Sequence, residues 1–238
     1  MNELPTVCIL AGGRGRRLGP RVTDVPKPLL EVGGEPFLFH QLRLLARHSA
    51  RRIVLCVGYL GERIRQRIGS RRFGLEIEYS FDAPGLDGTL GAIRRAQHLL
   101  GDRFLVLYGD TYLRLDYRTA VDEWRRSGLL GLMVVLRNDG RWDQSNTVYS
   151  DGRVIAHDKS TSTSAMRWID YGLGGLEATA LQRVPASERD LSSLYKRLAA
   201  VGELYGYEAH ERFYEIGRPE SLAETDAFLR RVNAGGSV

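Results

Sequence analysis

A run of glycines and arginines follows directly after the first apolar segment of the chain, with Arg14, Arg16 and Arg17 set among the glycines of 12–19. Glycine lets backbone N–H groups approach an anion closely, and arginine supplies charge with a fixed fork of donors. A Walker A loop requires Gly-Lys-Ser/Thr, which is absent, and a dinucleotide fingerprint requires a third glycine where Leu18 stands. The run therefore predicts a phosphate-binding loop outside these two classes.

Short apolar runs alternate with segments of helical periodicity up to residue 136. The runs predict strands at 6–11, 53–57, 75–80, 104–108 and 129–136, and the periodic segments predict helices at 37–49, 60–68, 91–100 and 116–127. This alternation favours an α/β fold, a Rossmann-like three-layer domain whose mostly parallel mixed sheet has helices on both faces. Ligands of such sheets bind beyond the carboxyl ends of the strands. The candidate binding loops are therefore 12–27, 84–91 and 109–111.

Beyond residue 136 the predicted strands become shorter and are joined by turns. Strands are expected at 147–149, 153–157, 169–176, 204–208 and 213–216, and helices at 190–200 and 219–233. No tract rich in proline, serine and glycine separates the two halves, and no internal repeat is visible. A single domain spanning 1–238 is the simpler expectation.

The charge balance favours a small anionic ligand over nucleic acid. The chain carries 34 basic and 29 acidic residues, a net charge of +5, and no basic stripe interleaved with aromatic residues. Cys8 and Cys56 stand in apolar runs without Cys-x-x-Cys spacing, which indicates buried free thiols in a reducing compartment. With no apolar run of ~18 residues and no basic leader at 1–5, we expect a cytoplasmic protein without a membrane partner.

The first loop and the segment after it resemble a compound family signature. Leu10–Leu18 followed by Val25–Leu29 is similar to L-A-G-G-x-G-T-R-L and then P-K-P of the sugar-1-phosphate nucleotidyltransferases. The order and length of this motif make chance agreement small. The resemblance continues over most of the chain, at Gly88–Ile93, Val106–Asp110, His157–Lys159, Ile169–Leu173 and Tyr214–Gly217.

The chain is most similar to short, single-domain members of that family, such as D-glycero-D-manno-heptose 1-phosphate guanylyltransferases and N-acetylmuramate 1-phosphate uridylyltransferases. The resemblance implies the nucleotide-diphospho-sugar transferase fold, with 1–136 mainly binding the nucleotide and 137–238 mainly binding the sugar. It also implies that a sugar 1-phosphate attacks the α-phosphorus of a nucleoside triphosphate and releases pyrophosphate. The attacking phosphate is already anionic at neutral pH, since its second pKa lies near ~6. No strong general base is needed.

The resemblance assigns catalytic roles to Arg17, Lys27 and Asp110. Arg17 would hold the outer phosphates, and Lys27, fixed by its flanking prolines, would contact the phosphates at the reacting centre. Asp110 ends an apolar strand, and we expect it to bind Mg²⁺ together with Glu215. The nucleotide would contact the first loop and a later turn, at Leu10, Ala11, Gly12, Gly13, Arg14, Gly15, Arg16, Arg17, Asp87 and Gly88.

The sugar phosphate is expected on the second half of the chain. Lys159 would bind its phosphate, and Asp170 would accept hydrogen bonds from sugar hydroxyls; the other expected contacts are Asn146, Asp158 and Gly172. Asp87 would accept from the amino group of guanine or cytosine. A turn aspartate without contact to substrate is the alternative for Asp87.

Two positions depart from the family pattern. Glu215 stands where most relatives have aspartate, and Arg16 stands where they usually have threonine. The favoured substrates are GTP with a heptose or hexose 1-phosphate. UTP or CTP, a non-sugar acceptor such as phosphocholine, and a nucleotide-binding regulatory module without catalysis remain as alternatives. The sequence leaves a monomer or a homodimer open.

Overall fold

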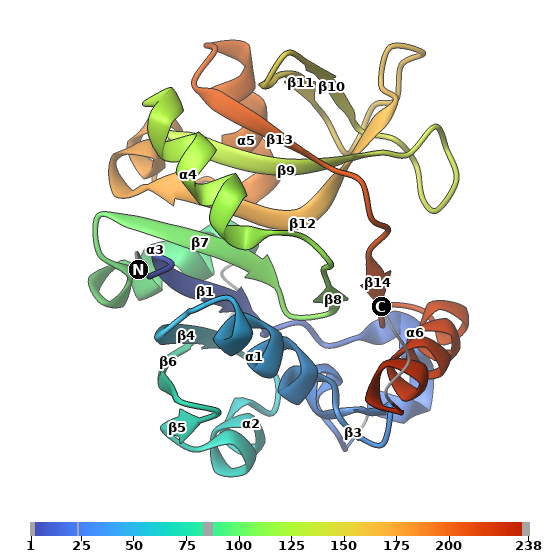
Figure 1. Cartoon of the computed structure of the whole chain (residues 1–238). Coiled ribbons are helices and arrows are strands. Elements are labelled where there is room, and N and C mark those ends of the chain that lie inside the picture. Colours follow the sequence, from blue (N-terminus) through green and yellow to red (C-terminus); the bar gives the residue numbers. More distant parts are fainter. Residues whose placement is uncertain (1–2, 23, 83–87, 235–238) are drawn as a thin grey trace.

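A ten-stranded sheet runs through the molecule (Figure 1). The computed structural model describes residues 3–22, 24–82 and 88–234. The strands lie in the order β10-β11-β13-β9-β12-β7-β1-β4-β6-β5. Their bounds are β1 Thr6–Leu10, β4 Arg52–Val57, β5 Arg71–Arg72, β6 Leu75–Phe81, β7 Arg103–Tyr108, β9 Gly131–Arg137, β10 Thr147–Ser150, β11 Arg153–His157, β12 Trp168–Glu177 and β13 Leu204–Ala209.

The sheet is mixed, and its parallel part is concentrated in the first half of the chain. Strands β7, β1, β4 and β6 are neighbours and parallel, as βαβ units require. Strand β12 then inserts antiparallel between β7 and β9. The expected mixed sheet is confirmed, but antiparallel pairs are more frequent than expected. In the second half of the chain, β10 and β11 form a hairpin and β12 pairs antiparallel with both of its neighbours.

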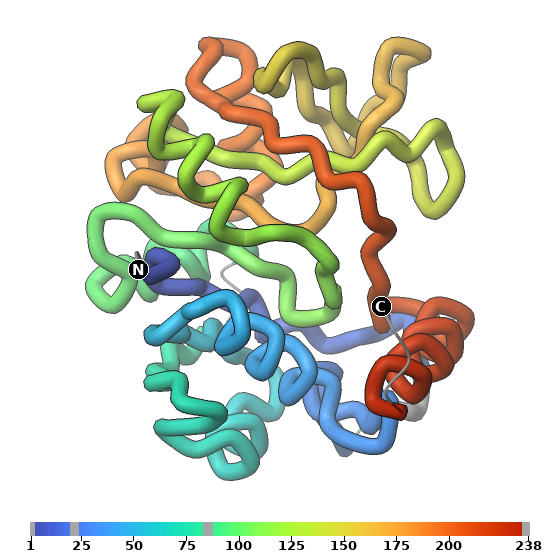
Figure 2. The backbone as a smooth tube through the Cα atoms, viewed as in Figure 1, coloured from blue at the N-terminus to red at the C-terminus, as the bar shows by residue number. Residues whose placement is uncertain are grey.

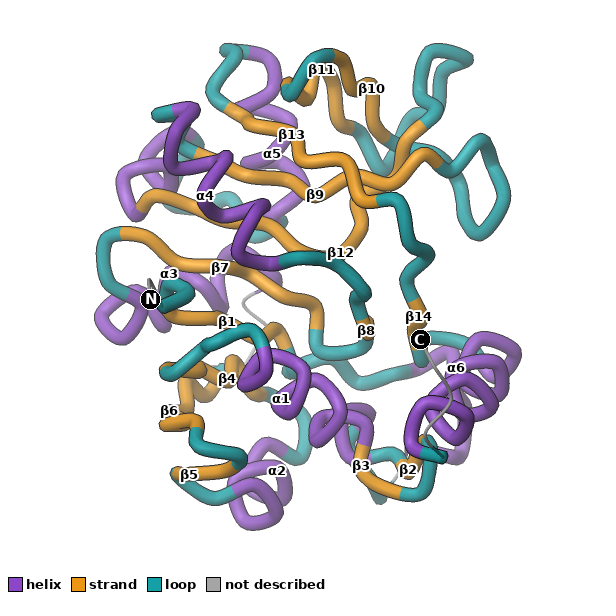
Figure 3. The backbone as a smooth tube through the Cα atoms, viewed as in Figure 1, coloured by secondary structure: helices purple, strands orange, loops and turns teal. Residues whose placement is uncertain are grey.

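Helices cover both faces of the sheet, as the three-layer expectation requires. Helices α1 (Phe37–Arg47), α2 (Gly61–Ile68) and α4 (Tyr117–Ser127) pack on one face. Helices α3 (Gly88–Leu100) and α5 (Leu191–Ala200) pack on the other. Side chains alternate along β1, so Val7 and Ile9 face the first group while Cys8 faces the second. The tube view shows the same helices on either side of the strands (Figure 3).

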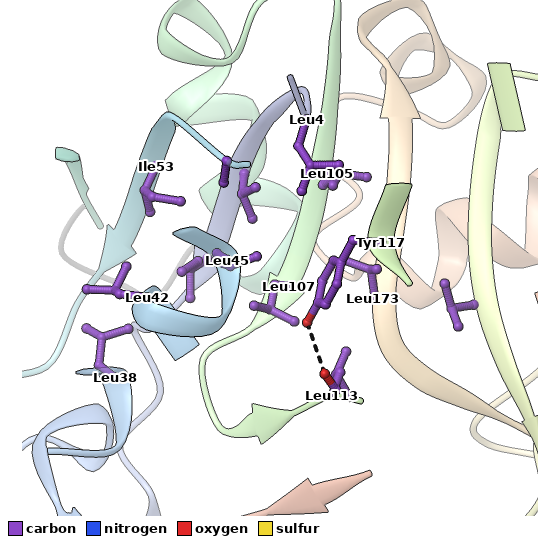
Figure 4. Close-up of a cluster of buried hydrophobic side chains, with 14 of the residues drawn as sticks. Leu4, Leu38, Leu42, Leu45, Ile53, Leu105, Leu107, Leu113, Tyr117 and Leu173 are labelled. Carbon is purple, nitrogen blue, oxygen red and sulfur yellow. Dashed lines mark hydrogen bonds between the residues drawn. The ribbon is translucent and has the colours of Figure 1, made fainter. Parts of the chain in front are cut away.

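The core under α1 and α4 is almost entirely apolar (Figure 4). Leu38, Leu42 and Leu45 of α1 are 0% exposed, and each such burial contributes about 1.5–3 kcal/mol. The one hydroxyl that Figure 4 shows bonded there belongs to Tyr117, which donates to the carbonyl of Leu113 at 3.4 Å. The strands that carry the candidate binding loops therefore pack on a buried apolar core.

Helix α6 (Pro219–Asn233) brings the end of the chain back beside residues 31–36 of the first half, as the tube trace shows (Figure 2). It packs on two small sheets, β2 (Glu31–Val32) with β3 (Glu35–Pro36), and β8 (Thr111–Tyr112) with β14 (Tyr214–Glu215). Short 3-10 helices lie at Arg16–Val22, Lys27–Leu29 and Ala178–Arg183. No helix within the described ranges is long and apolar enough to cross a bilayer.

Candidate active site

Three strand ends meet where the first loop begins. Leu10 pairs in register with both Tyr108 of β7 and Cys56 of β4. The loops that follow these residues therefore emerge side by side. A Cβ on Gly109 would lie 2.7 Å from the carbonyl oxygen of Leu10, so only glycine allows the two loops to approach this closely. This contact places Asp110 beside the glycine–arginine loop.

Two cavities open at this edge of the sheet and share part of their walls. We name the two cavities after the substrates that the sequence predicts for them. The nucleotide-side cavity, of about 490 Å³, is lined by the first loop, Asp82, Gly88 and Thr89. The acceptor-side cavity, of about 1070 Å³, is lined by residues of both halves of the chain, including Asn146, Lys159 and Asp170. The shared wall consists of Gly15, Arg16, Lys27, Tyr108 and Asp110.

Lys27 and Asp110 form an ion pair on the shared wall. The Lys27 Nζ donates to Asp110 Oδ2 at 2.6 Å, and the lysine side chain is only 13% exposed against 37% for the aspartate. The turn that carries Lys27 is fixed by two backbone bonds, from Leu29 N to the Pro26 carbonyl and from Leu30 N to the Lys27 carbonyl. The ammonium group is thus held at the boundary between the cavities.

Glu215 lies beside this ion pair because β14 pairs with β8. Glu215 is in register with Thr111, and the backbone N–H of Ile216 donates to the Asp110 carbonyl at 3.0 Å. A Cβ on Gly217 would lie 2.5 Å from Glu215 Oε2 and 3.5 Å from Lys27 Nζ. Glycine at 217 therefore leaves room for both charged groups, and Glu215 Oε2 accepts from its N–H.

The expected residues of the first loop divide between the two cavities. Leu10 through Arg16 line the nucleotide side, while Arg17 is exposed and lines only the acceptor side. Arg14 also stacks over the Tyr59 ring, with its guanidinium carbon 5.4 Å from the ring centroid. Three arginines and Lys27 thus surround the junction. The loop as a whole is placed as predicted, and the division of labour among its arginines stays a prediction.

Lys159 and Asp170 lie together on the acceptor side. Lys159 Nζ is 3.0 Å from Asp170 Oδ2, and it also donates to the Tyr108 hydroxyl at 3.2 Å. Burial would raise the pKa of Asp170, but the Lys159 ammonium keeps that pKa below its ordinary value. The other oxygen of Asp170 accepts from the Gly172 N–H at 3.0 Å. Asp170 was expected to accept hydrogen bonds from sugar hydroxyls, but protein groups already contact both of its carboxylate oxygens.

The remaining predicted contacts differ in their outcome. Asn146 lines the acceptor side, but its Oδ1 accepts from the Asp170 N–H at 3.1 Å. Asp158 lines neither cavity: it accepts from Lys196 Nζ at 2.7 Å and from the N–H groups of Ser160 and Thr161. Bonding to Lys196 and Ser160 holds the Asp158 pKa well below its ordinary range, so this carboxylate fixes a turn.

Gly88 lines the nucleotide side, and its glycine identity has a steric cause. Its φ is +65°, and a Cβ there would lie 2.5 Å from the Arg189 carbonyl oxygen. Asp87, predicted to face the base, lies outside the described residues. Cys8 and Cys56 are buried and free as predicted, yet their Sγ atoms are 3.4 Å apart, because β1 and β4 are neighbours.

The sequence did not predict several of the lining residues as site residues, among them Tyr108 and Asp82. Tyr108 is the residue before Gly109-Asp110, and it lines both cavities. Asp82 follows β6, and its carboxylate lies over Gly12 and Gly58, where Cβ atoms would be 2.5 and 2.4 Å from Oδ2. An acid at the carboxyl end of a predicted strand was the signal that could have identified Asp82.

Comparison with known proteins agrees with this geometry. The chain is 28% identical over 222 residues to the mannose-1-phosphate guanylyltransferase catalytic subunit beta of Danio rerio, and 26% identical over 221 residues to that of Drosophila pseudoobscura pseudoobscura. Each match covers 90% of this chain. The chain spans 61% and 59% of the length of these two relatives.

Solved structures share the fold. HddC from Yersinia pseudotuberculosis, complexed with GMP-PN, superposes with a TM-score of 0.79 at 24% identity, covering 94% of this chain and 99% of that one. A second HddC structure gives a TM-score of 0.80 with the same coverage. The sequence profile of the nucleotidyl transferase family matches residues 6–143, which is more than half of the chain. The chain belongs to the nucleotidyl transferase family.

Proposed function

We propose that this chain joins a nucleoside triphosphate to a sugar 1-phosphate and releases pyrophosphate. The observation that carries the proposal is the shared wall, where one cavity built on a phosphate-binding loop meets a second cavity containing a lysine. Two polyanionic substrates that occupy the two cavities would meet at Lys27. Holding both reactants in one geometry can supply about 7–11 kcal/mol of the barrier reduction.

The reaction is an exchange of one phosphorus–oxygen bond for another. An oxygen of the sugar phosphate forms a bond to the α-phosphorus, and the bond from that phosphorus to the pyrophosphate oxygen breaks. The attacking phosphate needs no base, because it is already ionised. Lys27 would stabilise charge on the α-phosphoryl oxygens, and Arg14 and Arg16, which line the nucleotide side, would hold the outer phosphates.

Asp110 and Glu215 fit a divalent cation, which we propose to be Mg²⁺. Both residues offer hard carboxylate oxygens on the acceptor side, and Asp110 is 37% exposed. The described residues form no cluster of three or more histidine, cysteine, aspartate or glutamate ligands. Two carboxylates suit Mg²⁺, which usually takes one or two and completes its shell with water and phosphate oxygens. Bound there, the ion would neutralise charge on the phosphates.

GTP is the nucleotide that we propose, with a hexose or heptose 1-phosphate as acceptor. The relatives are named as guanylyltransferases, and one HddC structure carries GMP-PN. Asp82 lines the nucleotide-side cavity, and guanine presents two adjacent donors, N1–H and the 2-amino group, that a carboxylate there would accept. Uracil and cytosine each present fewer donors on that edge. The name of the relatives makes mannose 1-phosphate the first sugar to test.

A substrate matrix tests the proposal. Each of GTP, ATP, UTP and CTP is mixed with mannose 1-phosphate, glucose 1-phosphate, a heptose 1-phosphate or choline phosphate, and pyrophosphate release is followed with and without Mg²⁺. We expect release only when GTP and a sugar 1-phosphate are both present. Release with choline phosphate would move the acceptor to another class. No release with any pair would favour a regulatory module without catalysis.

A further inference from the structure

Tyr108 stands between the two cavities and touches the groups that define the acceptor side. Its hydroxyl accepts from Lys159 Nζ at 3.2 Å and donates to Asp170 Oδ2 at 3.4 Å. The same carboxylate oxygen lies 3.0 Å from Lys159 Nζ, which closes a triangle of three groups. The ammonium also lies 5.0 Å from the centroid of the Tyr108 ring.

The hydrogen-bonding capacity of Lys159 makes this triangle directional. An ammonium group has three N–H donors. Two of them are directed to Tyr108 and Asp170, which leaves one for another acceptor. Lys159 is 41% exposed and lines the acceptor side, whereas Asp170 is 4% exposed. The remaining donor is therefore available on the side of the cavity.

The two partners of Lys159 are themselves fixed. The Tyr108 carbonyl accepts from Gln41 Nε2 at 3.0 Å, and Asp170 is held by the N–H of Gly172 and by Asn146. A lysine side chain normally has many rotamers, and ordering one of them on substrate binding has an entropic cost. In this protein, contacts with Tyr108 and Asp170 already order the Lys159 side chain before a substrate binds.

We propose that Tyr108 and Asp170 are positioning residues that hold Lys159 with a single N–H aimed at a phosphoryl oxygen of the acceptor. This inference rests on the proposed function and adds to it a physical division between the substrates. Tyr108 acts on the acceptor through Lys159, although its ring also lines the nucleotide side. The expected signature is an effect on the acceptor alone.

The first test is Tyr108→Phe, which keeps the ring and removes the hydroxyl. Loss of one hydrogen bond to a charged group should lower kcat/KM for the sugar 1-phosphate about tenfold while KM for GTP stays unchanged. Tyr117→Phe is the matched control, because it removes the hydroxyl of a buried tyrosine that donates to the Leu113 carbonyl and lines neither cavity. A Tyr108→Phe variant that behaves like this control would overturn the inference.

A double variant separates positioning from direct contact. If Tyr108 acts through Lys159, adding Tyr108→Phe to Lys159→Met should lower kcat/KM for the acceptor no further. A full additional loss in the double variant, or a raised KM for GTP in the single one, would contradict the inference. Asp170→Asn is the second single variant, should Tyr108→Phe fold poorly, and it should also weaken use of the acceptor alone.

Failure of this inference differs from failure of the proposed function. A wild-type protein that releases no pyrophosphate with any substrate pair refutes the proposed function. An active wild-type protein whose Tyr108 and Asp170 variants use the acceptor normally refutes only the positioning role. Thermal unfolding of each variant, measured alongside, shows whether a loss reflects the site or the fold.

Discussion

Removal of the Lys27 charge tests the central electrostatic feature of the site. Lys27→Met keeps the length and apolar stem of the side chain but deletes the ammonium. In the free protein the change breaks a single ion pair with Asp110, whose side chain is 37% exposed. Lys27 is mostly buried, but the carboxylate that the change leaves unpaired is partly exposed and can be solvated, so the cost to stability should be about 1 kcal/mol. The fold should therefore survive, with little change in the unfolding midpoint.

The expected loss of activity is much larger than the loss of stability. Lys27 Nζ approaches a carboxylate oxygen at 2.6 Å, and a similar approach to a phosphoryl oxygen places the charge about 4 Å from the phosphorus. Two unit charges at this separation interact with an energy of about 4 kcal/mol when the effective dielectric constant is about 20, a value that suits a mostly buried group. Because each ~1.4 kcal/mol is a factor of ten in rate, kcat should fall about a thousandfold.

The assay is pyrophosphate release with saturating GTP, Mg²⁺ and the best sugar 1-phosphate. Lys196→Met is the matched control, since Lys196 also pairs with an aspartate, Asp158, at 2.7 Å but lines neither cavity. The control should keep its rate within about twofold, because an exposed ion pair contributes little. If Lys27→Met retains more than about a tenth of the wild-type rate, the ammonium does not stabilise the transferring phosphoryl group as argued.

Three further changes probe other groups. Asp110→Asn should lower kcat about a hundredfold or more while the unfolding midpoint stays within a few degrees of wild type, as measured by turnover and thermal unfolding. Asp82→Asn should weaken GTP use and favour xanthosine triphosphate, whose 2-carbonyl accepts from an amide; unchanged kcat/KM for both nucleotides would remove Asp82 from base recognition. Burial lowers the pKa of His157 to about 4, so the unfolded state binds the extra proton first as pH falls. The free energy of unfolding should then decrease by up to about 1.4 kcal/mol per pH unit from pH ~6.5 towards ~4. Denaturant titrations at several pH values should show that the free energy of unfolding of His157→Gln depends less steeply on pH.

The first half of the fold could be predicted because its signals are local. The apolar runs that became β1, β4, β6 and β7 lie within one or two residues of their predicted positions. The antiparallel insertion of β12 between β7 and β9 left no such signal, since strand order depends on long-range packing. The 3.4 Å distance between the Sγ atoms of Cys8 and Cys56 was not predicted either, because it depends on β1 and β4 being neighbours in the sheet.

The candidate site shows the same limit. The compound motif placed Lys27, Asp110 and Glu215 correctly near one another, because residue order in a family signature reflects a shared geometry. It could not show which hydrogen bonds each side chain makes. Asp158 is turned to Lys196, and Asp170 is turned to Lys159, because both carboxylates find a nearby cation. Those pairings depend on side-chain direction, which residue types and spacing do not encode.

Lys27 and Lys159 each form an ion pair with an aspartate, but the two aspartates differ in how far they are buried. Both pairs join a lysine to an aspartate at the carboxyl end of the sheet, at 2.6 and 3.0 Å. Asp110 is 37% exposed, so in the proposed reaction it would exchange Lys27 for another cation and free the ammonium for a phosphate. Asp170 is 4% exposed and would be left as an uncompensated buried charge if Lys159 moved away.

Burial therefore assigns different behaviour to the two cations. Although burial alone would lower the pKa of Lys159, Asp170 and the Tyr108 hydroxyl keep it above its ordinary value, so this ammonium stays charged and in place. In the reaction that we propose, a fixed cation would suit the acceptor, whose phosphate must be held in line for attack. An exchangeable cation would suit the α-phosphorus, where charge would redistribute as one bond forms and the other breaks. The two lysines therefore differ because the Asp110 carboxylate is partly exposed and the Asp170 carboxylate is buried.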